Sequence, residues 1–236
     1  MARRIPANRF DDLVRSATQV FIEAGYRRTQ MADVAAAVGV AKGTLYGYVE
    51  GKEALFLLCL ASADAAKPIP LPEPLPLPSP EKGEIARRVR EALGSELRMP
   101  RFEAAIATAS PEDVGDEARG VVGELFDLMY ANRFGIKLLD RCMDHPDIQG
   151  LWQEQGREDV RAAVADYVRR REDSGHFRCF EDPRLAARFV VETCATWAVH
   201  IHWDRAPEQY DPALARANAI EFTVRGLLAD ANEATA

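Results

Sequence analysis

Apolar residues recur every three or four positions along most of the chain, which is the spacing of one face of an α-helix. The first such stripe ends at Ala24, and Gly25 follows it as a typical helix stop. Its members are Phe10, Leu13, Val14, Ala17, Val20, Phe21 and Ala24. A later helix, from about residue 52 to 66, is apolar on nearly every side, so we expect it to pack against two neighbours.

The strong patterns after residue 80 are also helical, and no segment alternates convincingly as a strand would. The expected helices cover about 81–94, 100–109, 116–143, 148–173, 183–204 and 211–231, with Gly, Ser or Pro between them. Gly135 lies inside the longest of these helices and predicts a kink there. The sequence therefore predicts an all-α protein.

A proline-rich segment, 67–80, interrupts this helical pattern with Pro at every second position from Pro68 to Pro80. Fixed φ angles and missing N–H donors exclude a helix or a central strand, so the segment should be extended. One interpretation is a stiff spacer or surface loop. The other is an arm that lays its aliphatic side chains on a partner subunit; these are Ile69, Leu71, Leu75 and Leu77.

Residues 35–48 have the pattern of two short helices joined by a tight turn at Gly39, where positive φ is needed. Leu45 points into a small shared core, and the second helix starts near Lys42. We expect its outer face to present Lys42, Gly43, Thr44, Tyr46 and Tyr48. One cation, one hydroxyl and two phenols suit a DNA major groove flanked by phosphates.

The charge distribution supports this interpretation, although the whole chain carries a formal charge of −7. Residues 1–52 hold eight Arg or Lys and five Asp or Glu, so the acidic excess lies in the remainder. Positive charge is thus concentrated where phosphate contact is expected. Arg3, Arg4 and Arg9 form a basic arm that either follows a phosphate backbone or is merely solvated.

From Gly25-Tyr26-Arg27-Arg28-Thr29 through Gly51-Lys52-Glu53-Ala54-Leu55-Phe56, the sequence resembles the DNA-binding domain of the TetR/AcrR family of bacterial regulators. Departures are Gln30 at a frequent capping position, Gly47 at a groove-facing position and Val49 in place of Phe. We expect Thr29 to cap the next helix. The resemblance and the pattern together give the expected DNA-binding residues as Arg28, Thr29, Gln30, Lys42, Gly43, Thr44, Tyr46, Tyr48 and Lys52.

The resemblance also implies the domain organisation. We expect a helix-turn-helix domain in 1–52, a connecting helix in 53–66, the proline-rich arm, and an effector-binding and dimerisation domain in 81–236. The homodimer should form through helices 183–204 and 211–231, a monomeric core being the alternative. The stripe expected on the last helix is Leu214, Ala217, Ile220, Val224, Leu227 and Leu228.

A ligand pocket among the helices of the larger domain is implied in the same way. Bulky apolar side chains with polar tips suit a small hydrophobic effector. The candidate residues are Phe126, Met129, Tyr130, Phe134, Trp152, Trp197 and His200, each of which could equally be core. The implied function is a DNA-binding transcriptional regulator, more readily a repressor, released from a palindromic operator by that effector.

Motifs for catalysis are absent from the sequence: there is no G-x-S-x-G, P-loop, G-x-G-x-x-G or H-E-x-x-H. We expect no enzyme activity, no cofactor and no metal. The alternative is a ligand- or metal-sensing protein with weakened DNA binding, its metal held by Cys142, His145, His176 and Cys179. Otherwise the four cysteines are buried thiols. No stretch is apolar enough to span a membrane, so we expect a cytoplasmic protein.

Overall fold

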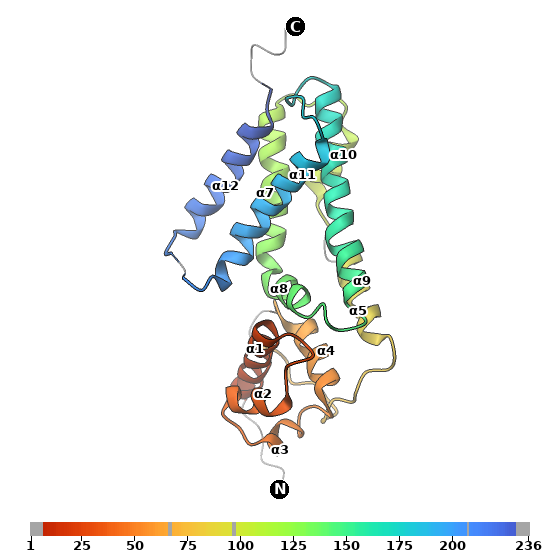
Figure 1. Cartoon of the computed structure of the whole chain (residues 1–236), viewed down its shortest axis with the longest axis vertical. Coiled ribbons are helices and arrows are strands. Elements are labelled where there is room, and N and C mark those ends of the chain that lie inside the picture. The colour runs from red at the N-terminus through yellow and green to blue at the C-terminus, as the bar shows by residue number, and fades with distance from the viewer. Residues whose placement is uncertain (1–6, 66–67, 96–97, 207, 230–236) are drawn as a thin grey trace. The chain divides into compact units, whose positions relative to one another are not determined.

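The computed structural model describes residues 7–65, 68–95, 98–206 and 208–229, and these form helices without any strand (Figure 1). The chain divides into two compact units. The N-terminal unit comprises residues 1–94 and 134–153, and the C-terminal unit comprises 95–133 and 154–236. The expected boundaries did not anticipate that residues 134–153 pack with the N-terminal segment.

The N-terminal unit is built on α1 (Ala7–Ala24), which packs against α2 (Met31–Val38) and α4 (Lys52–Ser62). Between the last two lies α3 (Lys42–Leu45). Most of α5 (Glu84–Ser95), most of α8 (Arg133–Arg141) and α9 (Gln149–Leu151) complete the unit. Its core is formed by fully buried side chains from these helices, among them Phe10, Leu13, Phe21, Leu45, Leu55, Phe56 and Leu138.

The proline-rich segment, residues 68–80, lies along this unit as a strap. The N–H of Ile69 donates to Asp11 Oδ1 at 2.6 Å, and the Ile69 side chain is buried. Further along, Leu77 N–H donates to the Tyr48 carbonyl at 2.8 Å, and Glu50 N–H donates to the Leu77 carbonyl at 2.9 Å. Because non-proline residues alternate with prolines, each supplies the N–H that its neighbours lack. The strap is therefore neither a free spacer nor a detached arm.

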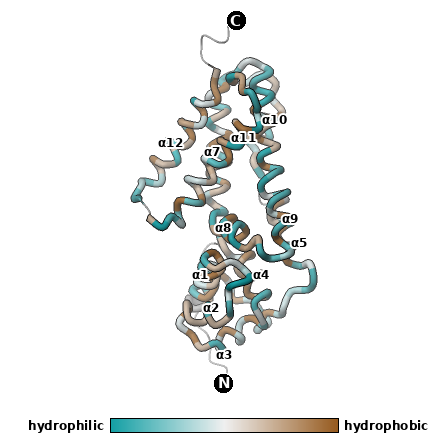
Figure 2. The backbone as a smooth tube through the Cα atoms, viewed as in Figure 1, coloured by the Kyte–Doolittle hydropathy of each residue, from teal (hydrophilic) through white to brown (hydrophobic). Residues whose placement is uncertain are grey.

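The C-terminal unit is organised around α7 (Val114–Ala131), which packs against α6 (Pro100–Ala107), α11 (Pro183–Ala198) and α12 (Pro212–Leu227). The hydrophilic α10 (Asp159–Asp173) packs on α11 (Figure 2). Asp residues cap the starts of α7, α11 and α12, and in the last two the Pro that follows fits the first helical position. A π-helix, Trp152–Glu158, leads into α10, and a 3-10 turn, His200–Trp203, follows α11.

One buried ion pair joins three helices of the C-terminal unit. Arg171 on α10 is 1% exposed, and its Nε donates to Glu117 Oε1 of α7 at 2.7 Å. Its other donors reach the carbonyls of Ala105 and Thr108 at the end of α6. The Tyr167 hydroxyl also donates to Glu117, at 3.1 Å. Every charge in this cluster has a partner, as a buried ion pair requires.

The expected helix 116–143 is divided into α7 and α8, so the predicted interruption is present. The break falls at Asn132, whose backbone leaves the helical region and whose side-chain amide donates to the Leu128 carbonyl at 2.9 Å. Gly135 lies within α8, where its N–H donates to Asp64 Oδ2. The expected connecting helix also ends early, at Ser62. No described helix combines the length and apolar content needed to cross a membrane.

Candidate nucleic-acid interface

The turn between α2 and α3 is set by Gly39. Its φ of 73° lies in the left-handed region, as the sequence predicted, and its N–H donates to the Ala36 carbonyl. Val40 N–H returns to the Ala35 carbonyl at 2.9 Å, which closes the end of α2. Leu45 is completely buried beneath the turn. The two short helices are thus held at a fixed angle by backbone bonds and one apolar anchor.

The outer side of α3 is exposed and chemically mixed. Lys42, Gly43 and Thr44 are all exposed, and Tyr46 is 40% exposed in the turn that follows. The Lys42 ammonium lies 5.9 Å from the centre of the Tyr46 ring. This surface offers a mobile cation and two hydroxyl groups, which can contact phosphates and base edges.

Tyr48 does not belong to this surface, contrary to the sequence prediction. It is 3% exposed, and its ring stacks on Phe10 of α1 with the ring centres 5.9 Å apart. The prediction failed because α3 ends at Leu45 and the chain then turns, so helical spacing no longer gives the direction of residue 48. Tyr48 is a core residue.

The expected capping residue of α2 was also wrong. Thr29 is buried, and its hydroxyl donates to the Gly25 carbonyl at 2.7 Å, so it does not face a phosphate. The N-cap is Gln30, whose N–H donates to Asp33 Oδ2 at 3.0 Å. The Gln30 side chain is exposed and remains available to DNA. Arg28 is exposed as well, with its Nε on the Ala24 carbonyl.

Lys52 has a structural role in place of the expected phosphate contact. Its ammonium donates to the carbonyls of Tyr26, Arg27 and Thr29 at 3.0, 3.4 and 3.2 Å. The same ammonium lies 4.4 Å from the centre of the Tyr26 ring. All three of its donors are therefore used within the protein, on the loop that joins α1 to α2. We call this arrangement the lysine lock.

Residues of the segment after α8 hold the other side of the same loop, and sequence reasoning missed them. The Asp144 carboxylate accepts from the N–H groups of Tyr26 and Arg27 at 3.0 and 2.8 Å. Arg141 Nε donates to the Ile22 carbonyl at 2.8 Å, near the end of α1. Both partners lie more than 100 residues away in sequence, so only the folded chain brings them together.

The rings of Tyr26, Phe56 and His145 form the apolar side of this junction. The His145 ring lies 4.4 Å from that of Tyr26 and 5.5 Å from that of Phe56, centre to centre. Burial lowers the pKa of His145, and its Nδ1 accepts the Asp147 N–H, so the imidazole is neutral. Burial likewise raises the pKa of Tyr26 to about 12. Both groups act here as packed, uncharged rings.

The Cys and His residues weighed as metal ligands belong to different units. Cys142 and His145 are buried in the N-terminal unit, whereas His176 and Cys179 lie in the C-terminal unit. Within the described ranges, no group of three or more His, Cys, Asp or Glu side chains is placed to hold a metal ion. Cys179 is exposed, unlike the other three cysteines.

The expected ligand-binding residues are divided in the same way. Phe134 and Trp152 belong to the N-terminal unit, where Trp152 is buried and its Nε1 donates to Asp140 Oδ1 at 2.6 Å. The other five lie on α7, on α11 and in the turn after it: Phe126, Met129, Tyr130, Trp197 and His200. The Tyr130 ring lies 5.6 Å from that of His202. The expected set is not collected in one place.

A short helix that follows a glycine turn and is carried by a packed three-helix core characterises a helix-turn-helix DNA-binding protein. Residues 13–59 match the family model described as bacterial regulatory proteins, tetR family. The chain therefore carries the N-terminal domain of the tetR family. No curated protein matches the sequence.

Solved structures resemble the chain over nearly its whole length. The ketosteroid transcriptional regulator KstR2 of Mycobacterium tuberculosis is 16% identical, with a TM-score of 0.57 over 96% of this chain and 98% of that one. A bacterial regulatory protein in the tetR family from Rhodococcus RHA1 is 19% identical, with a TM-score of 0.52 over 95% and 98%. At these identities the likeness establishes a shared fold, that of TetR-family regulators.

The structure assigns different roles to Lys42 and Lys52, which substitution separates. Lys42→Ala should remove one phosphate contact and flatten the plot of log affinity against log salt by about 0.9, with little change in stability. Lys52→Met should lower the free energy of unfolding by about 1–3 kcal/mol, because three loop carbonyls lose their donor. DNA titrations at several salt concentrations and urea unfolding measure the two effects.

Lys82→Met, at an exposed position of the same unit, is the control for loss of a lysine. The assignment of Lys52 fails if Lys52→Met flattens the salt dependence while leaving the unfolding free energy at the control value.

Proposed function

We propose that this chain is a homodimeric transcriptional repressor that binds a palindromic operator and is released by a small-molecule effector. The observation that carries the proposal is the exposed surface of Lys42, Thr44 and Tyr46 on a helix-turn-helix held rigid by the lysine lock. Lys42 and Arg28 would contact phosphates, and Gln30, Thr44 and Tyr46 would contact base edges. The protein would act on cytoplasmic DNA, without a catalytic step.

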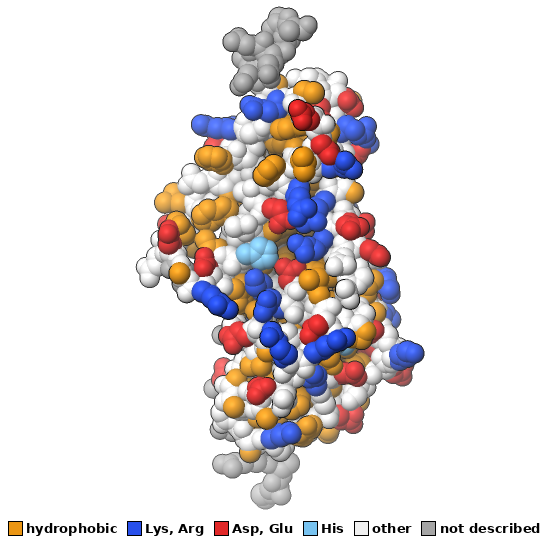
Figure 3. Space-filling model, in the orientation of Figure 1, with side chains coloured by type: hydrophobic (Ala, Val, Ile, Leu, Met, Phe, Trp, Pro, Cys, Tyr) orange, Lys and Arg blue, Asp and Glu red, His pale blue; other side chains and the backbone are white. Residues whose placement is uncertain are grey.

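An exposed apolar face on α11 and α12 supports the proposed dimer. Leu185 and Phe189 on α11 are 58% and 75% exposed, and Leu214 and Phe222 on α12 are 63% and 86% exposed. The two helices pack side by side, and apolar side chains gather where Figure 3 shows α12. So much exposed apolar area suits burial against a second copy of the same face.

The stripe expected from sequence lies on the opposite side of α12. Ile220, Val224 and Leu227 are buried within the chain's own unit. Periodicity found an apolar stripe but could not show that it faces inward. The residues that should meet the partner copy are instead Leu214 and Phe222, with the α11 pair beside them.

For the effector, the proposal keeps the five candidate residues of the C-terminal unit. Tyr130 is partly exposed, while Met129, Trp197 and His200 are half-buried. They lie on α7 and around the end of α11, two elements that pack against each other. A ligand that lowers operator affinity tenfold must favour the free protein by about 1.4 kcal/mol, and the operator must weaken its binding equally.

The function is tested by shift assays on duplex DNA flanking the gene. We expect saturable binding that persists in excess random DNA, with Thr44→Ala and Tyr46→Ala changing the order in which sequence variants bind. Lys42→Ala should weaken all of them alike. Binding no stronger than to random DNA would contradict the proposal and leave the sensor with weakened DNA binding.

The dimer is tested by light scattering on Phe189→Glu/Phe222→Glu. We expect monomers with unchanged helix content, since both residues are exposed and the added charges repel across a symmetric interface. Leu71→Glu, an exposed apolar residue of the strap, should stay dimeric. Val224→Glu should instead unfold the unit by burying a carboxylate. A double variant that remains dimeric would place the interface elsewhere.

A further inference from the structure

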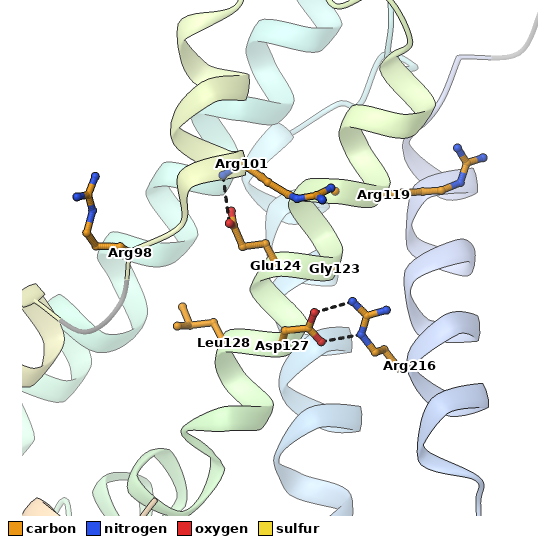
Figure 4. Close-up of a pocket in the computed structure, with 9 residues that line it drawn as sticks. Arg98, Arg101, Arg119, Gly123, Glu124, Asp127, Leu128 and Arg216 are labelled. Atoms are coloured by element: carbon orange, nitrogen blue, oxygen red, sulfur yellow. Dashed lines mark hydrogen bonds and ion pairs between the residues drawn. The ribbon is translucent and has the colours of Figure 1, made fainter. Parts of the chain in front are cut away.

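A cleft of about 410 Å³ in the C-terminal unit has α7 as its floor and α6 and α12 as its walls. Figure 4 shows Arg101 extending from α6 across α7, and Arg216 approaching from α12. Arg98 and Arg119 also line the cleft. Four arginines thus face one concave space in a chain whose net charge is −7.

The two acidic side chains of the cleft do not neutralise it, because both have other partners. Glu124 accepts the N–H groups of Arg101 and Phe102 at 3.1 and 2.9 Å, which caps α6. Asp127 forms a two-point pair with Arg216, with both distances 2.6 Å. No acidic side chain among the described residues pairs with the Arg101 guanidinium. A net positive charge is left over the floor.

Two glycines of α7 make room for these guanidiniums. A Cβ on Gly120 would lie 2.9 Å from an Arg101 terminal nitrogen, and one on Gly123 would lie 3.3 Å from a terminal nitrogen of Arg216. Glycine inside a helix costs about 1 kcal/mol relative to alanine. Here the missing side chains allow two planar cations to lie close to the helix surface.

We propose that this cleft binds a small polyanion, a molecule with two or more phosphate or carboxylate groups, with Arg101 as its main anchor and Arg216 as the second. Guanidinium donors match both groups in geometry. The volume fits a small ligand, and the lining is too polar for the hydrophobic effector considered above. Binding is a property of the protein alone and does not depend on the proposed DNA function.

The cleft stays open in the proposed dimer. At about 100° per residue, Arg216 lies roughly 160° around α12 from the middle of the face that carries Leu214 and Phe222. It shares the side of Ile220, whose Cδ1 also approaches the floor at Gly123. A partner seated on the exposed apolar face would leave Arg101 and Arg216 accessible.

Calorimetric titration of the full chain at constant ionic strength tests the site, with inorganic pyrophosphate and citrate as probes and acetate as the single-charge control. We expect saturable binding of a probe and none of acetate. Pyrophosphate binding alone would identify a phosphate ligand, and citrate binding alone a carboxylate ligand. Absence of binding by both probes would overturn the proposal.

Three variants locate the binding. Arg101→Gln should weaken the bound probe about tenfold or more, the effect of losing one charge-assisted contact. Gly120→Ala keeps every charge but displaces the Arg101 guanidinium, so it should weaken binding while leaving the helix at least as stable. Arg184→Gln, at an exposed arginine that starts α11, removes the same charge elsewhere.

Equal weakening by Arg101→Gln and Arg184→Gln would reduce the effect to overall charge and overturn the site. Weaker DNA binding with a flatter salt dependence in Arg101→Gln would show that the cleft meets a DNA backbone, which also overturns it.

Discussion

The DNA-reading part of this protein depends on how one loop, residues 25–30, satisfies its backbone. Three of its carbonyls converge on the Lys52 ammonium, and two of its N–H groups converge on the Asp144 carboxylate. A loop of this kind would otherwise leave polar groups half-buried and unpaired, at a cost of about 1–3 kcal/mol each. Because the loop fixes the start of α2, and Gly39 fixes α3 on α2, the direction of the recognition surface follows from these contacts.

The strap adds a second constraint at the opposite end of the recognition element. Its Leu77 pairs with the backbone on both sides of Val49, directly after the turn that carries Tyr46. The buried Asp11 carboxylate holds its other end through Ile69. An alternating proline sequence suits this role, because it has little conformational entropy to lose and still supplies one donor at every second residue.

Periodicity alone predicted the helical class, most helix positions and the left-handed glycine, since these depend on local spacing. It failed where direction depends on tertiary contacts. Tyr48 and Thr29 turned inward because α3 is only one turn long and α2 starts at Gln30. A lysine that binds carbonyls has no sequence feature that separates it from one that binds phosphate, so Lys52 was misassigned. The cleft could not be predicted, because Arg101, Gly120 and Arg216 meet only in the folded unit.

Native-state hydrogen exchange tests the lysine lock most directly. In Lys52→Met, the amides of Tyr26, Arg27 and Thr29 should lose much more protection than α1 core amides such as that of Leu13, because the loop opens locally once its carbonyls lose their donor. Amides of α11 should not change. Loop amides that keep their wild-type protection in Lys52→Met would contradict the claim that this lysine orders the DNA-reading surface.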